Sequence, residues 1–204
     1  MKRAVFVFGG GAALIAAGVF VLMSQPAVAP DELPAPLAPA MPESDLRDAD
    51  EIVVEGNRFT DTVQGYSGVI PDGWEIRKPI TPKQGISLYS PQALLEENEE
   101  GGSLGCKIQS GFLETEKGVD QLIKEIEENI LPFLTIKTFE KSIIVVKQFS
   151  GIKAILDSEE RGYSEAVYLS VDNRVYQTSL FAGEQAAEEC SKTFQQFISV
   201  LDFS

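Results

Sequence analysis

Two stretches of the chain repeat apolar residues at helical spacing, and each predicts an amphipathic helix. The first covers residues 118–131, where an apolar stripe lies opposite acidic residues: Val119, Leu122, Ile123, Ile126 and Ile130. Pro132 follows this stretch and ends the pattern. The second covers residues 184–201, again with one apolar face: Ala187, Cys190, Phe194, Phe197, Ile198 and Leu201. We expect both helices to pack one face on a core.

Shorter runs of apolar and β-branched residues predict strands on both sides of the first helix. Before it, they cover residues 52–59, 65–70, 74–76, 86–90 and 103–114. After it, runs follow at 136–149, 151–160, 163–171 and 174–182, with turns at Ser150-Gly151 and Asp172-Asn173. Residues 143–146 are apolar at four successive positions, which predicts a strand covered on both faces. The order of elements indicates one α+β domain over residues 51–204.

The N-terminal segment, residues 1–25, predicts a membrane anchor. Residues 4–23 carry no charge over twenty positions, and a helix of that length spans about 30 Å, the thickness of a bilayer core. Lys2 and Arg3 precede the run, so we expect a single-pass protein with a cytoplasmic N-terminus and its domain outside the cell membrane. The alternative is a signal peptide cleaved after Ala29, which would release a secreted protein, although Pro30 suits the peptidase poorly.

A flexible linker rich in proline and alanine is expected over residues 26–50. Its prolines exclude a regular helix or sheet ladder: Pro26, Pro30, Pro34, Pro36, Pro39 and Pro42. In extended polyproline geometry, this stretch could hold the domain up to roughly 60 Å from the membrane. A recognition ligand is the less favoured interpretation of the same prolines.

Charge and composition exclude several classes of function. The net charge of −14 argues against nucleic acid as a partner, because phosphate binding requires clustered lysine and arginine. The chain has no histidine, which removes histidine-activated nucleophiles and the commonest zinc ligand. We therefore predict no catalytic residue, no metal ligand and no cofactor site, and expect that the protein is not an enzyme.

The chain has two cysteines, Cys106 in a predicted strand and Cys190 on the apolar face of the last predicted helix. Outside the membrane, in an oxidising space, they could form a disulfide. The alternative is two separate buried thiols that act as small apolar residues. Spacing in the sequence does not decide between them.

Four aromatic residues are candidates for a partner surface. Trp74 follows a Pro-Asp-Gly turn at the start of a strand, where packing at one end of the sheet is favoured over a binding platform. Tyr163, Tyr168 and Tyr176 lie in the predicted hairpin strands, and the last two could be neighbours across the Asp172-Asn173 turn. Exposed, they would suit partner binding, whereas burial in the core is the favoured alternative.

Three motifs resemble the PsbP-like family over about residues 60–204. They are the strand and Pro-x-x-Trp turn of Ile70-Pro-Asp-Gly-Trp74, the antiparallel run over 163–182, and a closing helix and tail with spaced apolar residues: Phe194, Phe197, Leu201 and Phe203. This family includes the extrinsic photosystem II subunit, the Ran-binding Mog protein and exported bacterial proteins of unassigned role. The resemblance implies an antiparallel sheet of about six strands sandwiched by helices, and non-catalytic roles in partner binding or complex assembly.

These observations together favour a membrane-tethered, extracytoplasmic binding or assembly module with a protein partner at or near the membrane. A second hypothesis is an exported domain that binds a small molecule or metal, which requires a concave pocket with converging polar groups. A third is a hydrolase or lyase that uses Asp or Glu with Tyr or Lys, which requires a carboxylate in a cleft.

Overall fold

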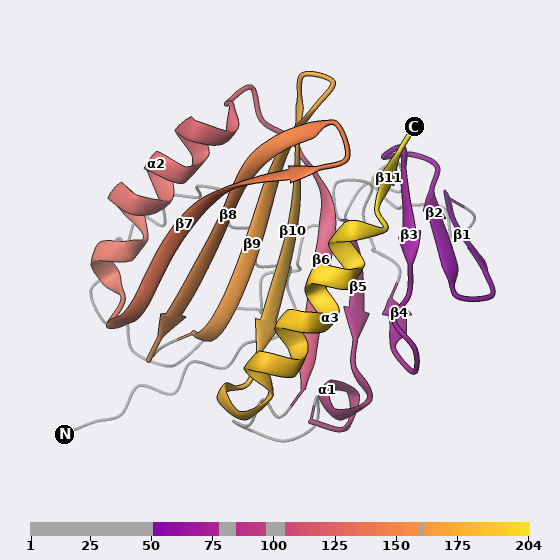
Figure 1. Cartoon of the computed structure of the whole chain (residues 1–204), viewed down its shortest axis with the longest axis horizontal. Helices are drawn as coiled ribbons and strands as arrows, with labels where there is room; N and C mark the ends of the chain where they lie inside the picture. Colours follow the sequence, from indigo (N-terminus) through magenta and orange to yellow (C-terminus); the bar gives the residue numbers. More distant parts are fainter. Residues whose placement is uncertain (1–50, 78–84, 97–104, 160) are drawn as a thin grey trace, which may run out of the picture.

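Seven antiparallel strands form the larger of two sheets in the computed structural model, which describes residues 51–77, 85–96, 105–159 and 161–204. Across this sheet the strands are ordered β4 (Glu75–Arg77), β5 (Ile86–Tyr89), β6 (Cys106–Leu113), β10 (Arg174–Ala182), β9 (Gly162–Val171), β8 (Phe149–Ser158) and β7 (Ile136–Val146). Figure 1 shows the long hairpin strands on one side and the short β4 on the other. The predicted anchor, 1–25, and linker, 26–50, lie outside the described residues.

A second sheet of four strands is formed by the two ends of the domain. Its order is β1 (Ile52–Glu55), β2 (Arg58–Asp61), β3 (Tyr66–Val69) and β11 (Asp202–Phe203). The tail strand β11 pairs antiparallel with β3, so the first and last strands of the described domain belong to the same sheet. The fold is α+β and antiparallel, but the expected sheet of about six strands is corrected to sheets of seven and four.

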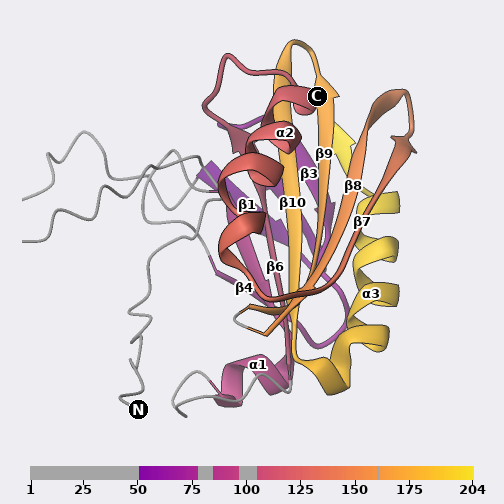
Figure 2. The same ribbon diagram turned by 90° about the vertical axis from the view of Figure 1, so that its left-hand side faces the viewer.

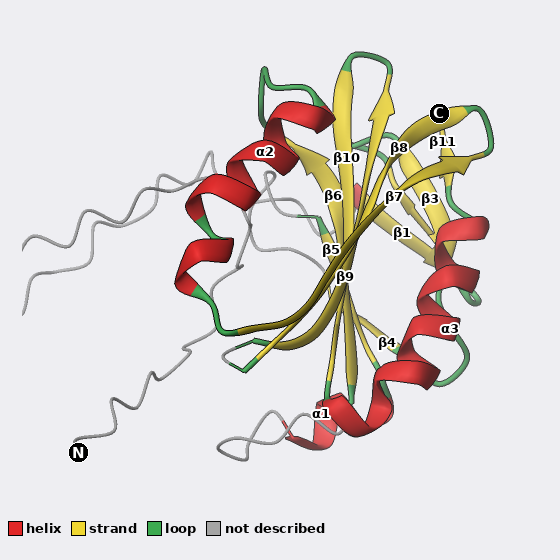
Figure 3. Cartoon of the chain, turned by 60° about the vertical axis from the view of Figure 1, so that its left-hand side comes forward, coloured by secondary structure: helices red, strands yellow, loops and turns green. Residues whose placement is uncertain are grey.

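The helices lie on opposite faces of the large sheet, as Figures 2 and 3 show for α2 (Val119–Asn129) and α3 (Ala187–Ser199). A six-residue helix, α1 (Pro91–Glu96), follows β5, and the 3-10 turns η3 (Leu131–Phe133) and η4 (Glu184–Ala186) flank the long helices. Both predicted long helices are confirmed, because their apolar stripes face the sheet: Leu122 and Ile123 of α2, and Cys190, Phe194, Phe197 and Ile198 of α3.

The main core fills the α3 side of the large sheet. Phe197 of α3 stacks on Phe59 of β2, with ring centroids 6.2 Å apart, so the small sheet closes this side of the core. A smaller core on the other face joins α2 to the sheet through Leu122, Ile123, Tyr168 and Val175. The large sheet is thus covered on both faces, although not over its whole width.

The backbone conformation at three turns explains where the predicted strands and turns agree with the structure and where they differ. Asp172 and Asn173 both have left-handed backbones, with φ of 47° and 62°, and connect β9 to β10 as predicted. The expected strand over 52–59 is instead a hairpin, β1 and β2, which turns at Gly56 with φ of 61°. The turn predicted at Ser150-Gly151 lies earlier, at Lys147-Gln148, and both predicted turn residues belong to β8.

Candidate interaction surface

The outer end of β7 exposes aliphatic side chains. We call residues 143–146 of β7 the apolar edge. Ile143 is 85% exposed and Val145 is 65% exposed, whereas Ile144 is half-buried and Val146 is buried. Since side chains alternate along a strand, the exposed pair lies on the α2 side of the sheet and the buried pair lies on the α3 side. The expectation that this strand is covered on both faces is therefore wrong.

The position of α2 explains the exposure. This helix packs against β8 and β9 and stops short of the outer end of β7. The pairing register forms a row from Tyr168 through Ile152 to Ile143, in which the side chains change from buried to half-buried to exposed. In Figure 2 the β7–β8 hairpin also leans away from α2, toward the side of α3.

A shallow groove lies on the other face of β7, opposite the exposed side chains of Ile143 and Val145, between the β7–β8 hairpin and α3. Its volume is about 290 Å³, and its lining includes Ile144, Val146, Lys147, Lys153, Gln195 and Ile198. Phe203 of the tail packs on Phe149 of β8, with ring centroids 5.2 Å apart, and so holds the hairpin to the small sheet. The exposed side chains of Ile143 and Val145 and the groove therefore lie on opposite faces of β7.

A buried charge pair lies beside this groove. The Lys153 ammonium contacts Glu165 Oε2 at 2.5 Å, and the Glu165 side chain is fully buried. The Tyr163 hydroxyl donates a hydrogen bond to Glu165 Oε1 at 2.6 Å. Burial, together with this carboxylate, raises the pKa of Tyr163 to about 12. These contacts join β8 to β9 and leave Glu165 occupied by internal partners.

The second lysine of the groove is paired as well. Lys147 donates to Asp202 Oδ1 at 2.9 Å and holds the pKa of that exposed carboxyl below its ordinary value. Both lysines thus neutralise acidic groups of the domain. The groove is accordingly better suited to aliphatic contact than to capture of an anion.

The four aromatic candidates do not form one surface. Tyr168 and Tyr176 are buried, at 1% and 0% exposure, so their proposed part in a partner surface is corrected. Their register also separates them, because Tyr168 lies opposite Gln177 and Tyr176 lies opposite Leu169. The expected cross-strand contact is therefore wrong: the two rings point to opposite faces of the sheet.

The other two candidates are partly buried and distant in the sheet. Trp74 packs against the main core, and its amide donates to the Pro71 carbonyl at 3.0 Å, which closes the turn before β4. Tyr163 lies on β9, and three strands of the sheet, β5, β6 and β10, separate β9 from β4. Neither residue belongs to the apolar edge.

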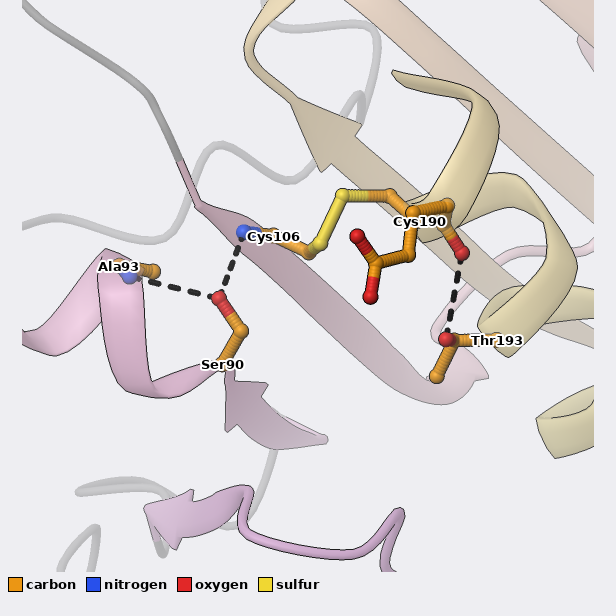
Figure 4. Close-up of a disulfide and its surroundings, with 6 residues drawn as sticks. Ser90, Ala93, Cys106, Cys190 and Thr193 are labelled. Carbon is orange, nitrogen blue, oxygen red and sulfur yellow. Dashed lines mark hydrogen bonds between the residues drawn. A yellow bond between two sulfur atoms is a disulfide. The ribbon is translucent and has the colours of Figure 1, made fainter. Parts of the chain in front are cut away.

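Cys106 and Cys190 form a disulfide, with Cα atoms 5.8 Å apart (Figure 4). It joins the first residue of β6 to the first turn of α3. Ser90 Oγ accepts hydrogen bonds from the Cys106 amide at 2.8 Å and the Ala93 amide at 3.3 Å, which also connects α1 to this corner. The disulfide therefore attaches the groove-lining helix to the sheet.

Sequence reasoning missed the apolar edge, although its signal was present. The run Ile-Ile-Val-Val predicts a strand covered on both faces, but Lys137, Glu140 and Lys141 precede it in the same strand. Charged residues of this kind are typical of edge strands. Across the described ranges, no three His, Cys, Asp or Glu residues gather as metal ligands. In the same residues, no helix has both the length and the hydropathy for crossing a membrane.

No protein-family model and no curated protein matches the sequence. Among solved structures, the protein is similar to cyanobacterial PsbP (CyanoP) from Synechocystis sp. PCC 6803, with 13% identity, a TM-score of 0.48, and coverage of 72% of this chain and 91% of that one. A Bacteroides thetaiotaomicron VPI-5482 protein matches with 14% identity and a TM-score of 0.42, over 74% of this chain and 49% of its own.

A third similar structure is PA94, a protein of unknown function from Pseudomonas aeruginosa, with 13% identity and a TM-score of 0.42. The match covers 64% of this chain and 88% of that one. The first of the three structures carries the name of the family that the sequence motifs resemble. At these identities and scores, the matches assign no function to the chain.

Proposed function

We propose that this protein is a non-catalytic module that binds a protein partner at the outer side of a membrane. The apolar edge is the observation that carries the proposal. Ile143 and Val145 are mostly in water, and covering each of them with a partner would contribute about 1–2 kcal/mol. Exposed aliphatic side chains on a long outer strand favour association with another polypeptide.

The proposed location rests on the N-terminal sequence and on the disulfide. Residues 4–23 have the length and lack of charge of a membrane-spanning helix, and the linker to residue 50 separates it from the domain. The bond between Cys106 and Cys190 supports an oxidising compartment, outside the cytoplasm. In this proposal, the anchor places the apolar edge within reach of proteins in or near the membrane.

A non-catalytic role is the corresponding part of the proposal. The chain lacks histidine, and both of its cysteines are in the disulfide. The buried carboxylate beside the groove, Glu165, is occupied by Lys153 and Tyr163. These side chains stabilise the domain and are poorly placed to act on a substrate in solution.

In-cell cross-linking of the tagged full-length protein, followed by mass spectrometry, tests the proposal. Three forms are compared: the natural protein, Ile143→Thr with Val145→Thr, and Val53→Thr with Val54→Thr. The last is a matched control, because Val53 and Val54 are also exposed, at 43% and 40%, on the outer strand of the small sheet. Threonine keeps the β-branched shape, so each strand should persist while its surface becomes polar.

We expect one envelope or membrane protein to be captured by the natural form and by the control. Its recovery should fall about tenfold for the Ile143 and Val145 variant, as a loss of about 1.4 kcal/mol requires. Capture of the same proteins by all three forms would contradict the proposed surface. The same sample shows whether peptides from residues 1–30 are retained, and their loss would replace the anchor by a cleaved signal peptide.

A further inference from the structure

We propose that the turn from α2 into β7, residues 130–136, is a second membrane contact, which inserts its apolar side chains into the interface of a neutral phospholipid bilayer. We call these residues the apolar tip. The inference rests on the membrane anchor of the proposed function, but it concerns a different surface from the apolar edge. It follows from the exposure of the tip, from its internal hydrogen bonds and from the charges beside it.

The apolar tip exposes a large aromatic ring. Its sequence, Ile-Leu-Pro-Phe-Leu-Thr-Ile, has no charged residue over seven positions. Phe133 is 81% exposed and Ile136 is 39% exposed, and no other aromatic side chain of the described residues is exposed. Leu131 and Leu134 are half-buried beside them. Apolar groups that gather in water on a folded domain mark a site of interaction with another protein or with a membrane.

The hydrogen bonds of the tip favour lipid over a second polypeptide. Within the turn, the Phe133 amide donates to the Ile130 carbonyl at 3.1 Å. The Leu134 amide donates to the Leu131 carbonyl, also at 3.1 Å. Pro132 has no N–H group. An unpaired N–H group is costly in lipid, and a turn that pairs its own donors avoids this cost. The same pairing leaves these donors unable to form a β-ladder with another chain.

The tip lies at an outer corner of the domain. Figure 1 shows the chain passing there from the lower end of α2 into β7, at the opposite end of β7 from the β7–β8 hairpin. Figures 1 and 3 both show this corner standing apart from α1 and α3. The corner can therefore enter a lipid interface while the sheets and the other helices remain in water.

The charges that flank the tip are paired. On the α2 side, Glu127 contacts the Lys141 ammonium. On the β7 side, the Lys137 ammonium lies 3.8 Å from Asp157 Oδ1 and 3.6 Å from Glu184 Oε1. Charges held in pairs are less costly to bring out of water than isolated ones. These contacts therefore lower the electrostatic barrier to approach of the tip to lipid.

The class of lipid follows from the remaining charge. The Glu159 amide donates to the Thr135 carbonyl at 3.1 Å, so an acidic residue lies next to the tip. The chain as a whole has a net charge of −14. Both features disfavour a surface of anionic lipid. Insertion of the tip therefore depends on burial of apolar groups, and a zwitterionic lipid such as phosphatidylcholine suits it best.

The proposed anchor makes weak insertion sufficient. In extended geometry the expected linker reaches up to roughly 60 Å, so it allows this corner to face the bilayer. Linked binding sites act at an effective concentration on the order of millimolar, and one exposed ring with its neighbours is then enough. Ile143 lies further along β7, about 23 Å from Ile136. The apolar edge would thus remain in water and accessible to a protein.

Tryptophan fluorescence in nanodiscs tests the proposal on the full chain. The protein is reconstituted into phosphatidylcholine discs whose acyl chains carry bromine, which quenches a tryptophan that enters the lipid. Three forms are compared, all with Trp74: the natural protein, Phe133→Trp and Ile143→Trp. The natural protein gives the contribution of Trp74. Ile143→Trp is the matched control, because Ile143 is 85% exposed and lies near the other end of β7.

We expect brominated lipid to reduce the added fluorescence of Phe133→Trp at least about twofold, because interfacial apolar groups lie about 5–10 Å into the headgroup and acyl boundary. Ile143→Trp should be quenched no more than the natural protein. Adding Ile136→Glu to Phe133→Trp should remove the quenching, since a carboxylate resists transfer out of water. Circular dichroism and thermal unfolding verify that the variants are folded.

Four results would overturn the proposal. Quenching of Phe133→Trp no greater than that of the natural protein would place the tip in water. Equal quenching of Phe133→Trp and Ile143→Trp would mean that the added tryptophan enters lipid wherever it stands. Unchanged quenching after Ile136→Glu would exclude insertion of the tip as a unit. Stronger quenching after addition of anionic phosphatidylglycerol would overturn the neutral class of lipid.

Size-exclusion chromatography separates failure of this inference from failure of the proposed function. A protein that elutes with the discs while its tip is unquenched loses the second contact and keeps the anchor. A protein that elutes apart from the discs loses both the anchor and the tip. Capture of a protein partner through Ile143 and Val145 is measured independently, by the cross-linking described above.

Discussion

Tyr168 and Tyr176 lie on neighbouring strands and point to opposite faces of the large sheet. Tyr168 packs in the smaller core with Leu122 and Ile123 of α2. Tyr176 lies in the main core, where its hydroxyl is hydrogen-bonded to Ser110 Oγ. Burial raises the pKa of both phenols above the ordinary value of tyrosine. The two residues therefore report on the two cores independently.

We predict that Tyr176→Phe destabilises the protein by about 1–2 kcal/mol, because it leaves the buried Ser110 hydroxyl without this partner. Tyr168→Phe should cost less than about 0.5 kcal/mol, since it keeps the ring and its packing. Urea unfolding of the two variants measures the difference. Equal losses would show that the hydrogen bond to Ser110 contributes nothing to stability.

The raised pKa of Tyr163 predicts a loss of stability in alkali. Its pKa of about 12 in the folded protein exceeds the ordinary value of 10.0, so folding favours the protonated phenol. This contribution is complete below about pH 10 and is lost as the pH rises through 12. Tyrosinate absorbance and urea unfolding across this range check the prediction. Tyr163→Phe should reduce the dependence of the free energy of unfolding on pH between about pH 10 and 12. An unchanged pH dependence in this variant would contradict the prediction.

Removal of the disulfide should destabilise the domain without changing its fold. Cys106→Ala with Cys190→Ala opens a link between positions 84 residues apart, and the expected loss is about 2–5 kcal/mol. Urea unfolding of the variant and of the reduced natural protein should give similar midpoints. A variant as stable as the oxidised protein would mean that noncovalent packing of Phe194 and Phe197 alone holds α3 in place.

Gly151 should not tolerate a side chain, although the backbone of β8 is regular there. A Cβ atom at this position would lie 1.8 Å from the backbone oxygen of Tyr168. We expect Gly151→Ala to cost about 3 kcal/mol or more, because the neighbouring strand would have to move. Gly118→Ala is the control, since a Cβ there meets nothing within 4 Å, and it should cost less than about 1 kcal/mol. Thermal unfolding compares the two.

The Lys153 and Glu165 pair predicts an asymmetry between single and double variants. Lys153→Met leaves the buried Glu165 carboxylate without its cation and should cost about 3 kcal/mol. Adding Glu165→Gln removes the charge and should recover part of this loss, since the Tyr163 hydroxyl can still donate to the amide oxygen. If the double variant lost as much free energy of unfolding as the two single variants together, the result would argue against coupling between the two residues.

Helices and turns were predictable because their signals are local. The stripe from Val119 to Ile130 can be buried only as a helix, and Asp172 and Asn173 accept the left-handed backbone that a two-residue hairpin turn needs. The turn predicted at Ser150-Gly151 was wrong because glycine occurs both in turns and in strands where another backbone approaches closely. At this position it permits close approach of Tyr168, and nothing nearby in the sequence distinguishes that role from a turn.

The candidate surface was harder to predict than the helices. An aliphatic run such as Ile143–Val146 has the same composition in a central strand as on an exposed edge. Its environment depends on where α2 stops and on which strands pair, and both are long-range properties. The prediction that Tyr168 and Tyr176 form a surface was wrong for a related reason. The face of the sheet to which each side chain points depends on the register between β9 and β10.

The class of the domain, its two amphipathic helices, one hairpin turn and the exclusion of histidine chemistry could all be derived from the amino-acid sequence. These follow from periodicity, from local backbone preference and from composition. Three features depend instead on how distant segments pack: the tail completes a second sheet with β3, Cys106 meets Cys190, and Ile143 and Val145 remain in water. Burial is a property of the assembled layers, because the same aliphatic side chain belongs to the core or to the surface according to whether a helix extends far enough to cover it.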